Sequence, residues 1–564
     1  MPTKRKSLAL TDPPDELRRK FLELKSRSDV AKFLDVSLKQ LTYHLVVVKD
    51  AERYTKFNIA KSSGGLREIR SPATALKIIQ KKLNQALQCV YEPRRPAHGF
   101  VKSRSVVTNA RLHAGAKFML NLDLKDFFPS INFGRVRGMF MARPYKLAPE
   151  AATVLAKICC FENQLPQGAP TSPAVSNMIC AKLDAELQRL AQRYNCLYSR
   201  YADDLTFSTH ASSFPKSLAR FVARPGGPET LVGGELERAV LGNGFQINPL
   251  KTRLQTKSRR QEVTGLTVNR FPNVKRQYVN QVRAMLHAWR LFGLDKAEAD
   301  FRNQYDRKRR NPKAPPPSFK RVVKGKLAYL IMVRGKADSV CIRLLREYVR
   351  LDPAFEFTCV VGPNTSIEIV KDAVWVLEAL SGTGENLVTE QGTAFFLAGV
   401  GLVTCAHVLR PDTHAVRPQE SHAQYPIKIV AVDEALDLAV LEVQGAHHDI
   451  ELPPGDPMAL RQSEPIQLLG FPNYAPGSQC ALRNGEVTAF RTVSGIRRIL
   501  IDANIISGNS GGPVLDAMHK VVGVAAKGAA AESEATLTDK HEVIPIDALT
   551  HLKGVKLPTE SIEA

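Results

Sequence analysis

Two aspartates stand side by side in a segment that otherwise suits a buried strand. Asp203 and Asp204 lie within YSRYADDLTFS, residues 198–208. Because neighbouring residues of a strand point to opposite faces, these carboxylates converge only from a tight turn between two strands. A hard divalent cation offsets the cost of gathering like charges, and Mg²⁺ prefers a few carboxylates together with substrate phosphates. The pair therefore predicts a metal-binding hairpin.

A third carboxylate is available upstream. Asp123 lies in NLDLKDFFPSI, where a short strand is followed by a turn. An aspartate at a strand end can meet a hairpin on the neighbouring strand. Asp123, Asp203 and Asp204 would then hold two Mg²⁺ ions, with Mn²⁺ as the alternative metal. Two such ions activate an attacking 3′ hydroxyl and stabilise a leaving pyrophosphate, so the three acids predict nucleotidyl transfer.

A second group of residues has the types found in serine hydrolases. His407 lies in TCAHV, Asp437 in DEALDLAVLEV and Ser510 in GNSGG. A serine hydroxyl becomes a nucleophile when a histidine removes its proton and an acid orients that histidine. The GNSGG segment also matches the nucleophile turn of α/β-hydrolases, but that fold requires the order Ser, acid, His. The order His, Asp, Ser in a β-rich segment favours an all-β hydrolase.

Charge divides the 564-residue chain into two parts. Residues 1–350 contain 65 Lys and Arg against 28 Asp and Glu, whereas residues 351–564 contain 14 against 27. The basic part predicts a polyanionic partner such as nucleic acid. Nine cysteines without a C-x-x-C pair, and an N-terminus without an apolar signal segment, predict a cytoplasmic protein with reduced thiols. No segment predicts a membrane span.

Periodicity of apolar residues predicts four regions along the chain. They are a helical region at residues 1–55, an α/β body at 56–272, basic helices at 273–350 and an all-β domain at 351–564. In the first region, Ser28 and Ser37 are the predicted N-caps of two helices.

Five segments occur in the order typical of one enzyme family. They are NLDLKDFFPSI, LPQGAPTSPAVSN, YADD, GFQINPLKTR and VTGLTVN, and through them the chain resembles reverse transcriptases over roughly residues 50–350. NARLH at 109–113 and VTG at 263–265 resemble motifs that mark retron reverse transcriptases. The resemblance implies a multidomain protein: an α+β right-hand polymerase with fingers, palm and a helical thumb, followed by the all-β domain.

The resemblance also implies contacts with deoxynucleoside triphosphates. The implied residues are Arg67, Arg70, Phe128, Gln167, Gly168 and Lys251. Phe128 would exclude a ribose 2′-hydroxyl, although a core aromatic is the alternative interpretation. Arg67 and Arg70 would contact the triphosphate, or else form surface ion pairs. Lys251 would protonate the departing pyrophosphate.

Contacts with RNA are implied for a second set of residues. These are Asn109, Ala110, His113, Val263, Thr264 and Gly265. The spacing of Asn109 and His113 also fits a capped helix with a histidine whose hydrogen bonds are made within the protein. Retron enzymes prime from a 2′-hydroxyl of a structured noncoding RNA and make a branched RNA–DNA product, msDNA. The implied partners are that RNA, the product held by the basic thumb helices, and a host ribonuclease H.

The β-rich part resembles chymotrypsin-like proteases, especially HtrA-type members, over about residues 375–550, which implies an all-β double barrel. The resemblance places the oxyanion hole at the N–H groups of Gly508 and Ser510. It places the specificity pocket at Asn504 and the substrate strand at Ala525 and Ala526. These uncharged residues predict a small or apolar residue in the protein substrate.

Together the two resemblances predict a bacterial retron reverse transcriptase fused to a trypsin-like serine protease. The family setting implies antiphage defence, in which the RNA–DNA product restrains the protease until phage infection releases it. Two alternatives are a group II intron-like reverse transcriptase, and an RNA-binding scaffold that controls the protease without polymerisation.

Overall fold

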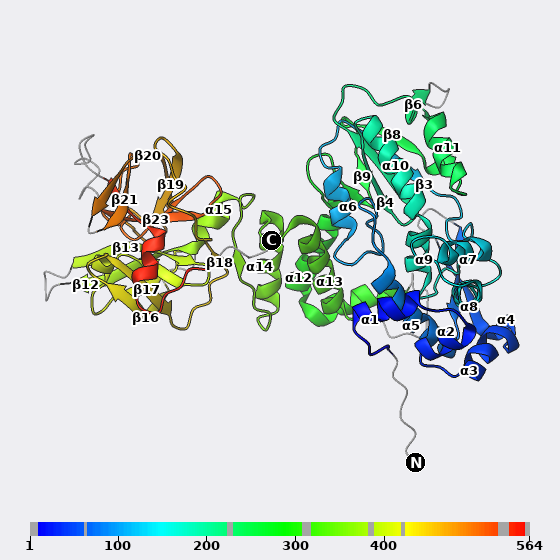
Figure 1. The fold of residues 1–564 in the computed structure, drawn as a ribbon. Helices are drawn as coiled ribbons and strands as arrows, with labels where there is room; N and C mark the ends of the chain where they lie inside the picture. Colours follow the sequence, from blue (N-terminus) through cyan, green and yellow to red (C-terminus); the bar gives the residue numbers. More distant parts are fainter. Residues whose placement is uncertain are drawn as a thin grey trace, which may run out of the picture. The chain divides into compact units, whose positions relative to one another are not determined.

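The computed structural model describes most of the chain and separates it into two compact units. The described residues are 9–60, 65–222, 229–306, 317–381, 388–418, 423–493, 495–527 and 541–558. The first unit runs from Met1 to Lys275 and the second from Arg276 to Ala564 (Figure 1). The expected fold class is confirmed, because an α/β body and basic helices precede two closed β-barrels.

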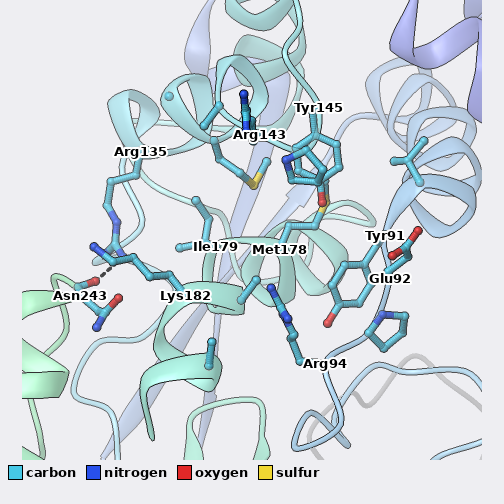
Figure 2. Close-up of a pocket in the computed structure, with 18 of the residues that line it drawn as sticks. Tyr91, Glu92, Arg94, Arg135, Arg143, Tyr145, Met178, Ile179, Lys182 and Asn243 are labelled. Carbon is cyan, nitrogen blue, oxygen red and sulfur yellow. Dashed lines mark hydrogen bonds between the residues drawn. The ribbon is translucent and has the colours of Figure 1, made fainter. Parts of the chain in front are cut away.

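The first unit is built mainly of helices around one small sheet. Its helices are α1 (Pro14–Leu22), α2 (Arg27–Phe33), α3 (Leu38–Thr42), α4 (Asp50–Arg53), α5 (Thr74–Val90), α6 (Val106–Leu112), α7 (Phe133–Met141), α8 (Pro149–Cys159), α9 (Ser172–Ile179), α10 (Ala181–Arg193) and α11 (Gly234–Gly242). A π-helical turn follows α3 at Tyr43–Val47, and a 3₁₀ turn lies at Pro249–Lys251. Several of these helices also line a pocket, drawn in Figure 2.

The sheet of the first unit has the strand order β4-β5-β3-β8, with all neighbours antiparallel. Its strands are β3 (Phe118–Asp123), β4 (Leu197–Tyr201), β5 (Asp204–Thr209) and β8 (Arg253–Thr256). Among the described residues of this unit, three further pairs of strands are antiparallel: β1 (Tyr54–Ala60) with β2 (Leu66–Pro72), β6 (Ala219–Val222) with β7 (Glu229–Val232), and β9 (Glu262–Val263) with β10 (Leu266–Thr267).

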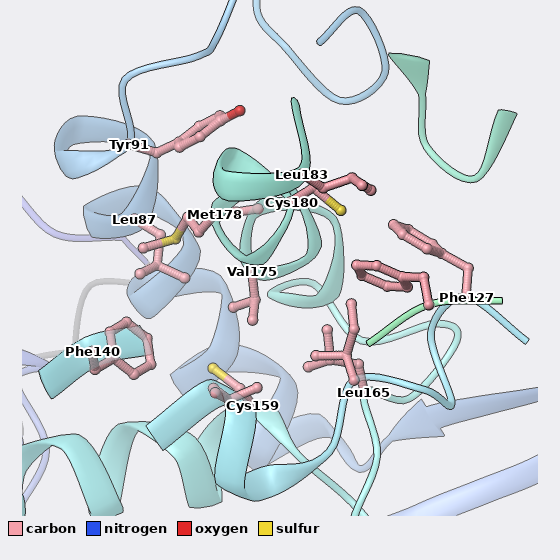
Figure 3. Packing of buried hydrophobic residues seen from close by; sticks show 14 of the residues in the cluster. Leu87, Tyr91, Phe127, Phe140, Cys159, Leu165, Val175, Met178, Cys180 and Leu183 are labelled. Carbon is pink, nitrogen blue, oxygen red and sulfur yellow. The ribbon is translucent and has the colours of Figure 1, made fainter. Parts of the chain in front are cut away.

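One continuous hydrophobic core holds the helices against this sheet (Figure 3). Phe127, Phe140, Leu165 and Val175 are among its buried members and come from segments far apart in sequence. Burying such side chains stabilises the fold by about 1.5–3 kcal/mol each. The core therefore fixes the sheet whose strand ends carry the predicted metal ligands.

The second unit contains three basic helices and two barrels. The helices are α12 (Arg276–Asp306), which is interrupted at Gly293, α13 (Phe319–Arg334) and α14 (Ser339–Leu351). Trp289 of α12 packs edge to face on Phe319 of α13 and Tyr348 of α14, which joins the three helices. A short linking region follows, with β11 (Cys359–Val360), α15 (Ile367–Val370) and a 3₁₀ turn at Lys371–Ala373.

Each barrel is a closed antiparallel sheet of six strands. The first contains β12 (Val374–Ser381), β13 (Val388–Leu397), β14 (Gly401–Thr404), β15 (His414–Val416), β16 (Gln424–Asp433) and β17 (Leu438–Val443). The second contains β19 (Pro465–Gly470), β20 (Ala481–Val493), β21 (Ile496–Ile501), β22 (Pro513–Leu515), β23 (Val521–Lys527) and β24 (His541–Pro545). Strand β18 (Ile450–Glu451) pairs with β11, and 3₁₀ turns lie at Ala406–Val408 and Ile546–His551. Each barrel encloses its own apolar cluster.

Candidate active sites

The three predicted metal ligands lie together at one end of the sheet in the first unit. Strand β4 ends at Tyr201 and β5 begins at Asp204, so Ala202 and Asp203 form the turn of a tight hairpin. Ala202 has the left-handed φ of 56° that such a turn requires. On the other side of β5, Asp123 lies directly opposite Asp204.

Electrostatics at this site favour a cation. Burial of the carboxylate raises the pKa of Asp204 to about 7, and repulsion by Asp203 and Asp123 adds to the effect. The pKa of Asp203 is raised by burial and by Asp123. Asp204 nevertheless keeps an exposed side chain, so an ion from solution can reach it. Three carboxylates that repel one another are the donor set expected for Mg²⁺, and these residues therefore fit the metal.

Lys251 and Asn248 contact the carboxylate of Asp123. Lys251 Nζ lies 2.7 Å from Asp123 Oδ2, and Asn248 Nδ2 donates to Asp123 Oδ1 at 3.3 Å. The 3₁₀ turn at Pro249–Lys251 carries the lysine, and the side chain of Asn248 caps that turn. The lysine therefore lies beside the predicted metal ligands, and its role at the pyrophosphate stays a prediction.

A buried ion pair supports the hairpin turn, and sequence reasoning missed it. Arg200 binds Asp184 of α10 through Nε at 2.8 Å and Nη2 at 2.7 Å, and both side chains are fully buried. Arg200 Nη1 donates to the carbonyl of Ala202 at 3.2 Å and to Asn177 Oδ1 at 3.0 Å. A detectable signal was the arginine within an otherwise buried strand, because such a charge needs a partner.

Gly99 also shapes this turn. A side-chain carbon at this glycine would lie 2.6 Å from Ala202 N. Asn177 Nδ2 donates to Gly99 O at 2.8 Å, so the same asparagine contacts both Gly99 and Arg200. The glycine therefore permits a close approach of two backbones that a larger residue would prevent.

A cleft of about 380 Å³ extends from the aspartates along the sheet. Asp123, Asp204 and Lys251 line one end, and Thr264 and Gly265 line it as well. Arg253 adds positive charge to its walls, whereas Arg260 is paired at 2.7 Å with Glu262, which also lines the cleft. A cleft with acids at the reacting end and the cations Lys251 and Arg253 beside them suits a polyanionic substrate.

Most of the six residues expected to contact RNA are too buried to do so directly, which corrects that expectation. Asn109, Ala110 and His113 are each at most 1% exposed, and Val263 is fully buried. His113 lies 2.7 Å from both Ser208 Oγ and Ser199 Oγ, and therefore joins β4 to β5. Burial lowers the pKa of His113 to about 3. His113 therefore stabilises the sheet of the first unit, which agrees with the alternative interpretation of a histidine hydrogen-bonded within the protein.

Thr264 and Gly265 differ from the buried members of their motif. They form the turn between β9 and β10 with φ of 47° and 84°, and Gly265 is exposed. Thr264 Oγ1 donates to Val106 O of α6 at 3.3 Å. The turn lines the cleft, and of the six residues expected to contact RNA, only Thr264 and Gly265 are accessible to a ligand.

The residues expected to contact nucleotide occupy different settings. Arg67 is exposed on β2, and its positive charge offsets a small part of the rise in the pKa of Asp203 that burial causes. The guanidinium of Arg70 instead forms ion pairs with Glu68 at 2.7 Å and Glu162 at 2.9 Å, which is the alternative named for it. The Arg70 N–H donates to Gln167 O at 2.7 Å.

Phe128 and Gly168 also occupy defined positions. Phe127 is 3% exposed and belongs to the core, whereas Phe128 is only partly buried, 5.2 Å from the Phe127 ring. Gly168 is exposed with φ of 120°, and a side-chain carbon there would lie 2.9 Å from Arg70 O. Glycine therefore lets the Gln167–Gly168 loop pack against the β1–β2 hairpin.

In the second unit, His407 and Asp437 form a close pair. His407 Nδ1 lies 2.7 Å from Asp437 Oδ2 and 2.9 Å from Oδ1, and the His407 N–H donates to Oδ1 at 2.9 Å. His407 belongs to a 3₁₀ turn after β14, and Asp437 precedes β17, the strand that pairs with β14. Asp437 has a φ of 61°, which turns its carboxylate toward the histidine.

Ser510 lies on the loop before β22 in the second barrel. Its Oγ is 3.5 Å from Ala526 O, and the described residues include no hydrogen bond from it to His407. Catalytic hydrogen bonds are often long before substrate binds. Gly508 has a φ of 91°, and a side-chain carbon there would lie 2.4 Å from Phe471 O. The turn that precedes the nucleophile therefore requires glycine.

Thr393 of β13 fixes this loop and was also missed from the sequence. Its Oγ1 donates to Gly508 O at 2.6 Å, and its N–H donates to Ser510 O at 2.9 Å. The side chain is fully buried. A strand of the first barrel thus positions the predicted oxyanion hole of the second.

The predicted specificity residues lie around the same loop. Asn504 is partly buried, Ala525 is fully buried and Ala526 is partly buried on β23. Residues 528–540, which follow β23, lie outside the described part of the chain. Cys405, His407 and Asp437 are close enough to hold a metal, but His407 and Asp437 are the pair predicted to activate Ser510. Among the described residues, no helix has both the length and the apolar character to cross a bilayer.

Comparisons with known proteins match both halves. Residues 59–268 match the family of reverse transcriptases (RNA-dependent DNA polymerases), and residues 392–524 match the trypsin-like peptidase domain. Retron Mx65 reverse transcriptase of Myxococcus xanthus is 38% identical over 283 residues, with 47% of this chain and 62% of that protein covered. Retron Ec86 reverse transcriptase of Escherichia coli is 32% identical over 262 residues, with 46% and 76% covered.

Two further similarities complete the comparison. Retron Mx162 reverse transcriptase of Myxococcus xanthus is 37% identical over 291 residues, and the chain covers 59% of its length. Among solved structures, the HtrA-type protease AlgW with tripeptide is 22% identical, with a TM-score of 0.27 and coverage of 32% of this chain and 60% of that one. On the match to Retron Ec86 reverse transcriptase, which the chain covers to 76%, the chain belongs to the family of retron reverse transcriptases, and it carries a trypsin-like peptidase domain at residues 392–524.

Proposed function

We propose that the protein copies part of its own structured noncoding RNA into msDNA, and that its peptidase domain is an effector in defence against phage. One observation carries the polymerase activity: Asp123 and Asp204 pair across two strands, with Asp203 in the adjoining turn. The arrangement gathers acids from two distant segments at one point. A purely structural turn has no need of a third carboxylate.

The residues around these acids have distinct tasks in this proposal. Asp123, Asp203 and Asp204 would hold two Mg²⁺ ions, which supply activation of the attacking hydroxyl and stabilisation of the pyrophosphate. Lys251, at Asp123, donates a proton to the departing pyrophosphate. Arg67 contacts the triphosphate of the incoming deoxynucleotide. Phe128, partly exposed, excludes the 2′-hydroxyl of a ribonucleotide.

The peptidase domain cleaves a protein through Ser510. Asp437 holds Nδ1 of His407, which leaves Nε2 to accept the proton of Ser510 Oγ. The attack on the substrate carbonyl places negative charge on its oxygen. The N–H groups of Gly508 and Ser510 stabilise that charge, and His407 returns the proton to the leaving amine.

The two activities serve one defence system in the bacterial cytoplasm. The RNA–DNA product, bound to the basic residues 276–350, restrains the peptidase, and its disturbance during infection releases proteolysis. A host ribonuclease H removes the copied template. Support comes from charge: residues 276–350 contain 19 Lys and Arg against 6 Asp and Glu, which suits a nucleic acid.

The test uses cells that carry the gene with its noncoding RNA and are challenged with phage. D203N/D204N should abolish msDNA and protection, and S510A should abolish protection while msDNA persists. Purified protein should incorporate deoxynucleotides only in the presence of Mg²⁺ or Mn²⁺. Fluorophosphonate labelling of Ser510 should rise when the RNA–DNA product is removed.

Two outcomes would contradict the proposal at different points. Protection that persists in D203N/D204N without any DNA would show that the basic part is an RNA-binding scaffold. Protection that persists in S510A would show that the peptidase is not the effector.

A further inference from the structure

A large basic pocket lies in the first unit, and neither proposed activity uses it. It is an open pocket of about 1130 Å³, lined by residues of α1, α7, α10 and the segment after α5 (Figure 2). None of its lining residues belongs to the metal-binding acids, to their cleft or to the residues expected to contact nucleotide. The pocket is therefore a separate candidate binding site.

Positive charge surrounds the pocket. Arg18, Arg94, Arg135, Arg143 and Lys182 line it, against Glu92 as its carboxylate. Glu92 is already paired with Arg18 at 2.7 Å, and Arg135 is held by three backbone carbonyls. Arg94, Arg143 and Lys182 are exposed and form no ion pair with another described residue. These three cations remain available to an anionic ligand.

The inner wall combines apolar surface with one unsatisfied polar group. Tyr91 is 7% exposed, and within the described residues its hydroxyl has no hydrogen-bond partner. Figure 2 shows this hydroxyl pointing into the space between the pocket residues, below Met178 and Ile179. Burial raises the pKa of Tyr91 to about 12, so the phenol stays protonated and can donate. An orphaned buried hydroxyl costs free energy unless a ligand completes it.

We infer that this pocket binds unpaired nucleotides of a single-stranded RNA. Phosphates contact Arg94, Arg143 and Lys182, and a base enters against Tyr145 and Met178 and receives the hydrogen bond of Tyr91. Single-stranded RNA is recognised in this way, by unstacked bases on aromatic side chains and by cations along the backbone. The volume exceeds what one nucleotide needs. The choice of RNA as the ligand rests on the proposed function. The evidence for a binding pocket is independent of that function.

The first test measures binding of a fluorescein-labelled ten-nucleotide single-stranded RNA to the full chain by anisotropy. R94E/R143E should weaken binding at least tenfold and lower its salt dependence. The matched control is R220E/R238E, which changes the same charge at two exposed arginines outside the pocket. Equal affinity of the two double variants would overturn the proposal.

Tyr91→Phe separates binding from folding. The phenol has no partner among the described residues, so its removal should leave the melting temperature unchanged or higher. RNA affinity should fall about three- to tenfold, the usual worth of one hydrogen bond. Unchanged affinity would show that the hydroxyl does not contact RNA. RNA containing 4-thiouridine should crosslink to peptides that contain residues 91–94 or 143–145.

Two further experiments are needed. One distinguishes RNA from a free nucleotide as the ligand, and the other distinguishes failure of this proposal from failure of the proposed function. Displacement of the RNA by millimolar ATP would assign the pocket to a free nucleotide and overturn the RNA proposal. D203N/D204N should bind the RNA normally, and R94E/R143E should still extend a DNA primer on a poly(rA) template. Loss of primer extension in the wild type, with RNA binding intact, would refute the polymerase and leave the pocket standing.

Discussion

The buried pair of Arg200 and Asp184 explains how one hairpin turn can hold acidic residues in a fixed place. Arg200 donates two hydrogen bonds to Asp184, one to Asn177 and one to the carbonyl of Ala202. Arg200→Met should destabilise the first unit by about 3–5 kcal/mol, because Asp184 is left charged and buried. Primer extension should fall as well, since the turn loses its support.

The double variant R200M/D184L provides the matched control. Removing both charges restores an apolar interior, so its unfolding free energy should exceed that of Arg200→Met. Calorimetry of the full chain measures the stability, and single-nucleotide incorporation measures the site. Equal stability of the single and double variants would show that the pair does not act as a unit.

His113 predicts a dependence of stability on pH. Its pKa is about 3 in the fold against 6.5 in an unfolded chain, so the unfolded state takes up a proton first as the pH falls. Its contribution is fully present above pH 6.5 and is lost as the pH falls toward 3. Between pH 7 and 5 the melting temperature of the first unit should drop about 4 °C more in the wild type than in His113→Gln. Equal drops would contradict this account.

The sequence could predict those site residues whose type and pattern suit catalysis better than packing. Asp203, Asp204 and His407 have no structural reason to stand where they do, so their pattern points to catalysis. Asn109 and His113 carry a polar pattern too, yet they are buried. Polar residues alone do not reveal which side of a helix packs against the core. A histidine that is hydrogen-bonded in the core and one that contacts a ligand produce the same sequence pattern.

At the scale of elements, β13 connects the two barrels through Thr393. Thr393→Val keeps the shape but leaves the carbonyl of Gly508 without its donor and the Phe471 N–H without its acceptor. Labelling of Ser510 by a fluorophosphonate should slow about 10- to 100-fold, because the oxyanion hole loses its orientation. Thr389→Val, on the exposed end of the same strand, should label at the wild-type rate. A wild-type rate in Thr393→Val would refute this role.

Element boundaries show where local rules succeed and fail. Ser37 caps α3 as predicted, with its Oγ accepting from the Gln40 N–H. The prediction for Ser28 is wrong, because Ser26 caps α2 in a box with Asp29. Ser26 and Ser28 both lie near the start of the helical pattern. Ser26 is the cap because Asp29, three residues later, can complete the capping box. Contacts such as Thr393 with Gly508 join residues 115 positions apart, and no local pattern encodes them.

At the scale of the whole molecule, the basic helices and the peptidase share one compact unit. Residues 276–350 have a net charge of +13 and residues 351–564 of −13. The second unit therefore has no net charge, but its basic and acidic residues are segregated along the sequence. Arg346 of α14 joins the two parts, with Nη1 at 2.6 Å from Asp372 and Nε at 2.5 Å from Asp449. Thr365 Oγ1 also donates to Ala337 O, and the Ser366 N–H donates to Ser339 Oγ. Helices that grip a nucleic acid would therefore act directly on the peptidase.

Arg346→Ala tests this mechanical connection. It leaves Asp372 and Asp449 without their shared cation, so the helices should loosen from the first barrel while both barrels stay folded. Hydrogen exchange should rise in α14 and residues 359–372, and labelling of Ser510 should respond at least threefold less to removal of the RNA–DNA product. Arg343→Ala, at an exposed position of the same helix, should keep the full response. A full response in Arg346→Ala would show that the product acts on the peptidase by another route.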